Sequence, residues 1–170
     1  MKVQSRLFMF LVLCAAMFAV TFEARAQQSS QPSPTDTAAK PAKASEADLA
    51  AIKQTALDYI EGYYEGNAER MERALHPELA KRIVRTDPNS GRSRLDQMSA
   101  MTLTQGTRAR ASSPTPKEKR QNDVTVLDVF ENAASVKVVA SEWIDYLHVA
   151  KFNGRWVIVN VLWELKPQQK

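Results

Sequence analysis

An Asn-Gly pair near the C-terminus constrains the fold of this chain more than any other feature. Asn153 and Gly154 separate two runs in which apolar residues recur at alternate positions, WIDYLHVAKF and RWVIVNVLWEL. A two-residue type I′ turn needs positive φ at both central positions, and Asn-Gly tolerates that conformation well. The pair therefore predicts an antiparallel β-hairpin with these two residues as its turn.

Counting outward from the turn predicts which side chains share a face. Continued pairing opposes His148 to Val159 and places Tyr146 beside His148 on one face, with Asp145 on the other. Because the face with Asp145 carries more charged side chains, we expect Tyr146 and His148 to point toward the helices. A single acid–phenol–imidazole cluster of Asp145, Tyr146 and His148 is then not expected.

The face that carries Asp145 is nevertheless rich in apolar residues. The same counting places on it Leu147, Val149, Trp156, Ile158 and Leu162. An exposed apolar surface of this size usually marks an interface. We therefore expect a homodimer in which the outer faces of two sheets meet.

Helical periodicity comes before these strands. Ser45, followed three residues later by an aspartate, resembles a capping box, and apolar residues recur at three-to-four spacing through residues 49–63. Gly66 ends this predicted helix, and Asn67 is placed to cap a second short helix, AERMERAL.

The signals between the second helix and the strands are weaker. In HPELAKRIV, Pro77 suits a first helical turn or a chain reversal, and RTDPNSGRSR has the composition of a turn. Leu95, Met98 and Met101 suggest a third short helix, with Ser99 as a candidate cap. The polar run ASSPTPKEKRQ predicts a loop.

Two further strands precede the C-terminal hairpin. DVTVLDVF and AASVKVVASEW alternate as strands do and flank Glu131-Asn132, which predicts a second turn. Helices followed by antiparallel strands indicate an α+β fold in which the helices cover one face of the sheet.

The first residues have the pattern of a secretory signal peptide. Lys2 and Arg6 precede an apolar run over residues 7–20, and Ala24-Arg25-Ala26 has the small-x-small pattern of a cleavage site. The run is shorter than the roughly 20 residues that span a bilayer. We therefore expect residues 1–26 to be cleaved and the protein to be exported, periplasmic or secreted, without a stable membrane anchor.

The mature chain is expected to begin with a linker. Residues 27–44, QQSSQPSPTDTAAKPAKA, contain too little apolar surface to fold and predict a disordered segment. Residues 45–170 then form one domain of common size.

Several kinds of site are not expected. The lone cysteine, Cys14, lies in the predicted signal peptide, so the mature chain has no disulfide and no thiol nucleophile. Its two histidines, His76 and His148, lack the spacing of metal ligands, and no phosphate-binding loop or GxSxG motif is present. Residues 81–120 are basic but hold no aromatic residue for base stacking. We expect no metal, no cofactor and no nucleic-acid partner.

Three stretches taken together resemble the putative lumazine-binding family. They are ALDYIEGYYEGNAERMERALHPELAKRIV, VTVLDVFENAASVKV and WIDYLHVAKFNGRWVIVNVLWELKP. This family belongs to the nuclear transport factor 2-like (NTF2-like) superfamily, with the SnoaL-like polyketide cyclases and ketosteroid isomerase. The resemblance implies a cone-shaped NTF2-like fold, in which N-terminal helices pack in a curved antiparallel sheet. It also implies a ligand pocket between helices and sheet, and dimers through the outer sheet face.

Candidate ligand-binding residues come from the predicted inner faces and from one helix junction. Tyr59 and Tyr63 lie one turn apart on the first helix, and His76 is placed to reach a pocket mouth. Core packing or a bond to backbone is the alternative for each. The complete set of candidates is Tyr59, Tyr63, His76, Met98, Met101, Tyr146, His148 and Trp163.

Three functions follow as hypotheses. The first is an exported protein that binds a small, flat or partly apolar molecule, with Tyr63, Tyr146 and His148 as polar contacts. The second is an isomerase- or cyclase-type enzyme with His148 as general base, which requires an open pocket and a nearby tyrosine donor. The predicted inner face of the C-terminal hairpin offers no carboxylate to such an enzyme. The third is a non-catalytic dimeric interaction module, because one fold can host unrelated functions.

Overall fold

The computed structural model describes residues 44–167 of the 170-residue chain. The predicted signal peptide and residues 27–43 of the predicted linker lie outside the described residues. Residues 44–167 form three α-helices, one short 3-10 helix and six β-strands, which is the predicted α+β class. Within residues 44–167, no helix is both long enough and apolar enough to cross a membrane.

Helix α1 (Glu46–Glu65) has the caps that the sequence predicts. The side chain of Ser45 accepts the backbone N–H of Asp48 at 3.0 Å. Gly66 ends the helix with φ 67°, and a Cβ at this position would lie 2.5 Å from the Cα of Ala111. Conformation and space therefore both require glycine here.

The two shorter helices also begin at side-chain caps. Asn67 caps α2 (Ala68–Ala74), as predicted, and Ser99 caps α3 (Ala100–Ala109). A 3-10 helix, η1 (Lys117–Lys119), interrupts the loop that leads to the next strand.

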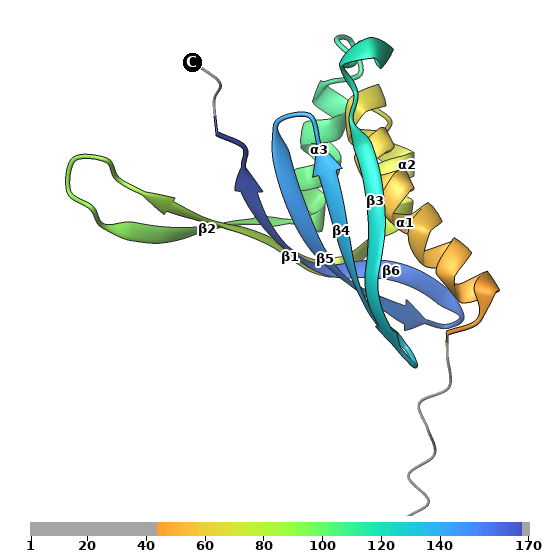
Figure 1. Ribbon diagram of the computed structural model, residues 1–170. Helices are drawn as coiled ribbons and strands as arrows, with labels where there is room; N and C mark the ends of the chain where they lie inside the picture. Colours follow the sequence, from red (N-terminus) through yellow and green to blue (C-terminus); the bar gives the residue numbers. More distant parts are fainter. Residues whose placement is uncertain (1–43, 168–170) are drawn as a thin grey trace, which may run out of the picture. The chain divides into compact units, whose positions relative to one another are not determined.

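A curved six-stranded sheet forms the second layer (Figure 1). Its strands are β1 (Leu75–Thr86), β2 (Ser93–Ser99), β3 (Asn122–Phe130), β4 (Ala133–Ala140), β5 (Trp143–Phe152) and β6 (Arg155–Leu165). They lie in the order β2-β1-β6-β5-β4-β3, and the helices cover one face. All neighbouring strands are antiparallel except β1 and β6, which run parallel.

The segment predicted as a helical turn or chain reversal is strand β1. Leu79, Lys81 and Ile83 are buried, with more exposed residues between them, which is the period of two that a strand requires. The strand was missed because Lys81 interrupts the apolar alternation and Pro77 also suits a helix start. Residues 93–99 form β2, which pairs antiparallel with β1, so the third helix begins later than predicted.

The C-terminal hairpin has the predicted turn but a different register far from it. Asn153 and Gly154 adopt φ values of 49° and 79°. Near the turn the predicted pairs are present, whereas His148 opposes Asn160 instead of Val159. A β-bulge in β6 inserts one extra residue, and every predicted pair beyond it is displaced by one.

The predicted assignment of faces on β5 is wrong. Asp145 is fully buried beneath the helices, whereas Tyr146 is 46% exposed and His148 lies beside it on the outer face. Counting charges was the wrong criterion, because Lys81 neutralises Asp145 inside the fold. Four apolar residues expected outside belong to the core, namely Leu147, Val149, Trp156 and Ile158, and Leu162 is exposed as expected.

Asp48 joins the start of α1 to the C-terminal hairpin. Its Oδ1 accepts from Lys151 Nζ and from Trp156 Nε1, both at 2.8 Å. The hydrogen bond from Lys151, with those from Trp156 and Ser45, lowers the pKa of Asp48 to about 2. These hydrogen bonds hold the first turn of α1 against the hairpin of β5 and β6.

We expect Asp48 to make the folded state sensitive to acid. Its carboxylate has a lower pKa in the folded chain than the ordinary value of 3.8, so its contribution is complete above about pH 4 and is lost as the pH falls toward 2. Urea unfolding at several pH values should show that Asp48→Asn loses this part of the acid dependence. Glu46→Gln removes a carboxylate from the same helical turn and should keep it. Identical acid profiles for Asp48→Asn and the unaltered chain would contradict the assignment.

Candidate functional site

A charged cluster is buried between α1 and the sheet. Asp145 accepts three hydrogen bonds: from Lys81 Nζ at 2.6 Å, from the Tyr59 hydroxyl at 3.2 Å and from Trp143 Nε1 at 2.7 Å. Lys81 also donates to the Tyr59 oxygen at 2.5 Å. We call Tyr59, Lys81, Trp143 and Asp145 the buried cluster.

Secondary structure brings these four residues together. Trp143 and Asp145 are two apart on β5, so both face the helices, and Lys81 lies on the inner face of β1. Strand β6 separates β1 from β5, and the long lysine side chain spans it to reach the carboxylate. Tyr59 comes down from the buried face of α1.

Burial controls the protonation of the cluster. Burial lowers the pKa of Lys81, and the carboxylate of Asp145 opposes this shift. Burial, together with the negative charge of Asp145, raises the pKa of Tyr59 well above its usual range. Tyr59 is therefore a neutral phenol, able both to accept from Lys81 and to donate to Asp145.

Aromatic rings continue from the cluster along the inner face of the sheet. Lys81 Nζ lies 4.7 Å from the ring centre of Trp163 and 5.7 Å from that of Trp143. The ring of Tyr63 meets Trp143 edge-on at 5.1 Å. We call Tyr63, Trp143 and Trp163 the aromatic row.

Arginines stand at both ends of the aromatic row. The guanidinium of Arg110 lies 4.4 Å from the ring centre of Tyr63, and that of Arg85 lies 5.8 Å from Trp163. Arg85 pairs with Asp96, whereas Arg110 has no ion pair among the described residues. Cations over aromatic faces are held by the quadrupole of the ring.

Three buried polar atoms, one of them in this row, have no hydrogen-bond partner within the described part of the chain. They are Oγ1 of Thr107, Nε of Arg110 and Nε1 of Trp163. Buried polar groups are nearly always paired, so these three atoms are exceptions within the described part of the chain.

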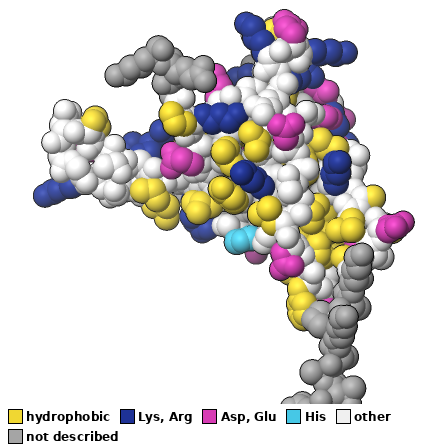
Figure 2. All heavy atoms as spheres, viewed as in Figure 1, with side chains coloured by type: hydrophobic (Ala, Val, Ile, Leu, Met, Phe, Trp, Pro, Cys, Tyr) yellow, Lys and Arg dark blue, Asp and Glu magenta, His cyan; other side chains and the backbone are white. Residues whose placement is uncertain are grey.

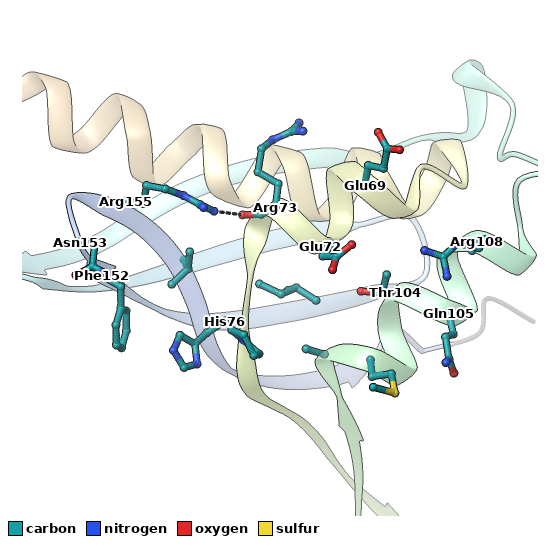
Figure 3. Close-up of a pocket in the computed structure, with 15 residues that line it drawn as sticks. Glu69, Glu72, Arg73, His76, Thr104, Gln105, Arg108, Phe152, Asn153 and Arg155 are labelled. Carbon is teal, nitrogen blue, oxygen red and sulfur yellow. Dashed lines mark hydrogen bonds between the residues drawn. The ribbon is translucent and has the colours of Figure 1, made fainter.

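A groove on the outside of the domain is separate from the buried cluster (Figure 3). It lies between α2, α3, the start of β1 and the turn of β5 and β6, and has a volume of about 870 Å³. His76, Met101 and Phe152 are among its lining residues, and no member of the buried cluster or the aromatic row is. This groove and the buried ionisable groups with shifted pKa values are thus in different places.

The predicted site residues fall into three groups. Tyr59, Tyr63 and Trp163 lie on the inner side of the sheet, and His76 and Met101 line the groove. Met98 is half-buried on β2. Tyr146 and His148 are on the outer face, so the structure does not bring them to the interior.

The geometry that an enzyme with His148 as general base requires is not present. His148 is exposed, and its Nδ1 lies 3.3 Å from Nδ2 of Asn160 on the outer face. Tyr63 lies on the opposite side of the sheet. The inward carboxylate that the hairpin was expected to lack is present, because Asp145 faces the helices.

Sequence reasoning missed Lys81, Trp143 and Asp145. The alternation of β5 places Trp143 and Asp145 on one face. That face could have been assigned to the interior if a partner for Asp145 had been recognised. No pattern in the sequence indicated that Lys81 is buried, because Lys81 comes near Asp145 only through the parallel pairing of β1 with β6. Within residues 44–167, no group of three or more His, Cys, Asp or Glu side chains could hold a metal ion.

Comparisons with known proteins agree on one family and one fold. The sequence profile described as putative lumazine-binding matches residues 47–164. Comparison with curated proteins finds no match.

Two solved structures illustrate the likeness in fold. An NTF2-like protein of unknown function from Methylobacillus flagellatus KT is 21% identical, with a TM-score of 0.58 over 74% of this chain and 97% of that one. A second, from Silicibacter pomeroyi DSS-3, is 16% identical, with a TM-score of 0.57 over 73% of this chain and 100% of that one. At this identity the likeness concerns the NTF2-like fold alone.

A double-mutant cycle tests the electrostatics of the buried cluster. Asp145→Asn keeps an acceptor for Tyr59 and Trp143 but leaves the Lys81 ammonium unpaired, and should lower the free energy of unfolding by about 3–5 kcal/mol. Lys81→Met leaves the carboxylate unpaired and should cost a similar amount. The double variant buries no charge and should recover most of the loss, because an apolar replacement of a buried pair is often neutral.

Urea denaturation of the four proteins measures this coupling. Additive losses in the double variant would show that the two charges do not interact, which would contradict the cluster as described.

Proposed function

The chain belongs to the putative lumazine-binding family, and we propose that it binds a small, flat, partly apolar molecule against the aromatic row. Membership of this family and the NTF2-like fold support small-molecule binding in general. The narrower proposal, which includes export of the chain, is ours. In this proposal the polar contacts to the ligand come from residues on the inner side of the sheet and no longer from Tyr146 and His148.

The aromatic row is the observation that carries this proposal. Tyr63 and Trp163 are partly buried rings beside the buried Trp143, and Nε1 of Trp163 is a buried donor without a partner among the described residues. Apolar walls with a few well-placed polar groups are the usual composition of a ligand site.

The buried cluster favours a binding role over simple packing. A buried ion pair rarely stabilises a fold better than apolar side chains of the same volume. Lys81 has three N–H donors, of which two bind Tyr59 and Asp145. The third would serve a carbonyl or ring nitrogen of a heteroaromatic ligand at the edge of Trp163, because Nζ itself lies over the ring face.

We expect planar heteroaromatic compounds to stabilise the protein. Lumazine and riboflavin should raise the melting temperature of the full chain, since a ligand at a hundredfold excess over its Kd adds about 2.7 kcal/mol. They should also quench tryptophan fluorescence. Trp163→Leu should abolish both effects, and Tyr146→Phe on the outer face should leave them unchanged. Failure of both compounds to shift the melting temperature, or equal shifts in Trp163→Leu, would refute this site.

We also propose a homodimer through the outer face of the sheet. Tyr146 on β5 neighbours Leu162 on β6, and the two side chains are 46% and 50% exposed. Val84 and Leu95 extend exposed apolar surface onto the projecting hairpin of β1 and β2. Figure 2 shows hydrophobic side chains gathered across the strands, among charged ones. Exposed apolar patches of this kind commonly mark interfaces.

A charge placed in this patch should prevent the association. We expect the unaltered chain to have twice the monomer mass in size-exclusion chromatography with light scattering, and Leu162→Glu to have the monomer mass. Ala50→Glu adds the same charge to the exposed face of α1 and should remain dimeric. A monomeric unaltered chain at about 100 µM would remove the proposal, given the roughly 800 Å² per partner that stable interfaces bury.

A further inference from the structure

The groove between α2 and α3 has the size of a ligand site. Its volume of about 870 Å³ lies within the roughly 300–1,000 Å³ range of ligand pockets. It shares no lining residue with the aromatic row or the buried cluster. An occupant of the groove would therefore not be the molecule proposed above.

The floor of the groove is apolar and belongs to the buried core. Leu75 at the start of β1, Ala100 at the start of α3 and Val157 on β6 line it, and their exposed fractions are 6%, 8% and 6%. Three different elements thus supply an apolar base to one concave surface.

The walls of the groove are also apolar, but they are open to solvent. Met101 on α3 and Phe152 on β5 line the groove and are 69% and 45% exposed. The ring of His76 packs against Phe152, with the ring centres 4.5 Å apart. Large apolar side chains left exposed in a concave surface favour an apolar ligand, because its binding removes them from water.

Five charged residues line the groove, but two of them turn away from it. Figure 3 shows the side chains of Glu69 and Arg73 pointing out of the groove, and Arg73 is paired within the helical layer. The other three, Glu72, Arg108 and Arg155, are left to set the charge of the groove.

These three side chains give the groove an excess of positive charge. Glu72 on α2 and Arg108 on α3 point toward each other across it (Figure 3). Within residues 44–167, none of the three side chains forms an ion pair. One carboxylate faces two guanidinium groups, so one positive charge remains whichever arginine offsets Glu72.

Arg155 is held in place by the neighbouring helix. Its Nη2 donates to the carbonyl of Arg73 at 3.0 Å, which leaves its other N–H groups for a ligand. Guanidinium groups bind carboxylates through two parallel hydrogen bonds when both partners are free to align. Arg155 can therefore receive a carboxylate at the rim of the apolar floor.

We propose that this groove binds an apolar monocarboxylic acid. The hydrocarbon part of the acid packs on the floor and against Met101 and Phe152, and its carboxylate accepts hydrogen bonds from Arg155. The apolar floor and walls disfavour a strongly polar molecule, and the excess positive charge favours a single anionic group over a cationic one.

A series of linear acids tests the apolar part of the proposal. Calorimetric titration of the full chain with sodium butanoate, hexanoate and octanoate should show affinity that rises with chain length. Each added CH₂ should tighten binding by about two- to fourfold as it leaves water. We expect a Kd for octanoate on the order of 100 µM, as ligands of this size give.

An amine of the same length tests the charge. Octylammonium has the same hydrocarbon chain and the opposite charge, and it should bind about tenfold more weakly than octanoate, because repulsion replaces attraction at the arginines. Arg155→Gln keeps an N–H donor for the backbone carbonyl and should remove most of this preference. Arg155→Glu makes the groove net negative and should reverse it. Arg92→Glu makes the same charge change on the projecting hairpin and should preserve the order of the unaltered chain.

Matched apolar variants locate the hydrocarbon chain. Met101→Gln should weaken octanoate and octylammonium by a similar factor, about two- to tenfold, because it removes apolar wall without changing the charge. Leu127→Gln on β3, where the side chain is 53% exposed, removes comparable apolar surface elsewhere and should leave both affinities unchanged.

The outcomes separate this site from the two surfaces proposed above. Trp163→Leu should keep octanoate binding while it loses lumazine binding, and Leu162→Glu should keep it while it loses the dimer. Loss of octanoate binding in either variant would place the acid inside the domain or on the outer face, which overturns the proposal for the groove alone.

Three further results would also overturn it. They are the absence of saturable octanoate binding up to about 10 mM, equal affinity for the three acids, and an unchanged preference for octanoate in Arg155→Glu.

Discussion

The ion pair between Lys81 and Asp145 is the constraint on which the inner side of this fold depends. A charge without a partner cannot stay in an apolar interior, so β1 and β5 must remain close enough for the two side chains to meet. Tyr59 adds α1 to the same set of contacts. One cluster thereby connects the helical layer to two strands that β6 separates, and it leaves a polar group at the centre of an otherwise apolar core.

The domain offers two surfaces with different chemistry. The inner face of the sheet holds aromatic rings with cations above them, which suits a planar molecule. The groove between α2 and α3 is open and mixed in charge, and most of its polar side chains come from the helices. Because the groove shares no lining residue with the cluster, the two surfaces can be altered independently. The proposed functions can therefore be tested independently.

Local signals predicted much of the fold from the sequence. Ser45, Asn67 and the Asn153-Gly154 turn act through their own backbone, so their roles need no knowledge of distant residues. Prediction failed where a residue depends on a distant partner. Strand β1 was missed because Lys81 can point inward only where it forms an ion pair with Asp145. Tyr146 and His148 were predicted to point inward because that ion pair was unknown. Of the candidate site residues, Tyr59, Tyr63 and Trp163 do lie on the inner side.

The sequence by itself determined the α+β class, the helix caps, the strand segments of the C-terminal half and the family. These features follow from short-range periodicity and turn chemistry, which a linear chain displays directly. Only the tertiary structure decided which face of each strand is inside. A β-bulge in β6 and the buried ion pair of Lys81 with Asp145, 64 residues apart, set those faces. Both depend on contacts between segments that are distant in the sequence, and no local sequence pattern predicts that these segments lie close together.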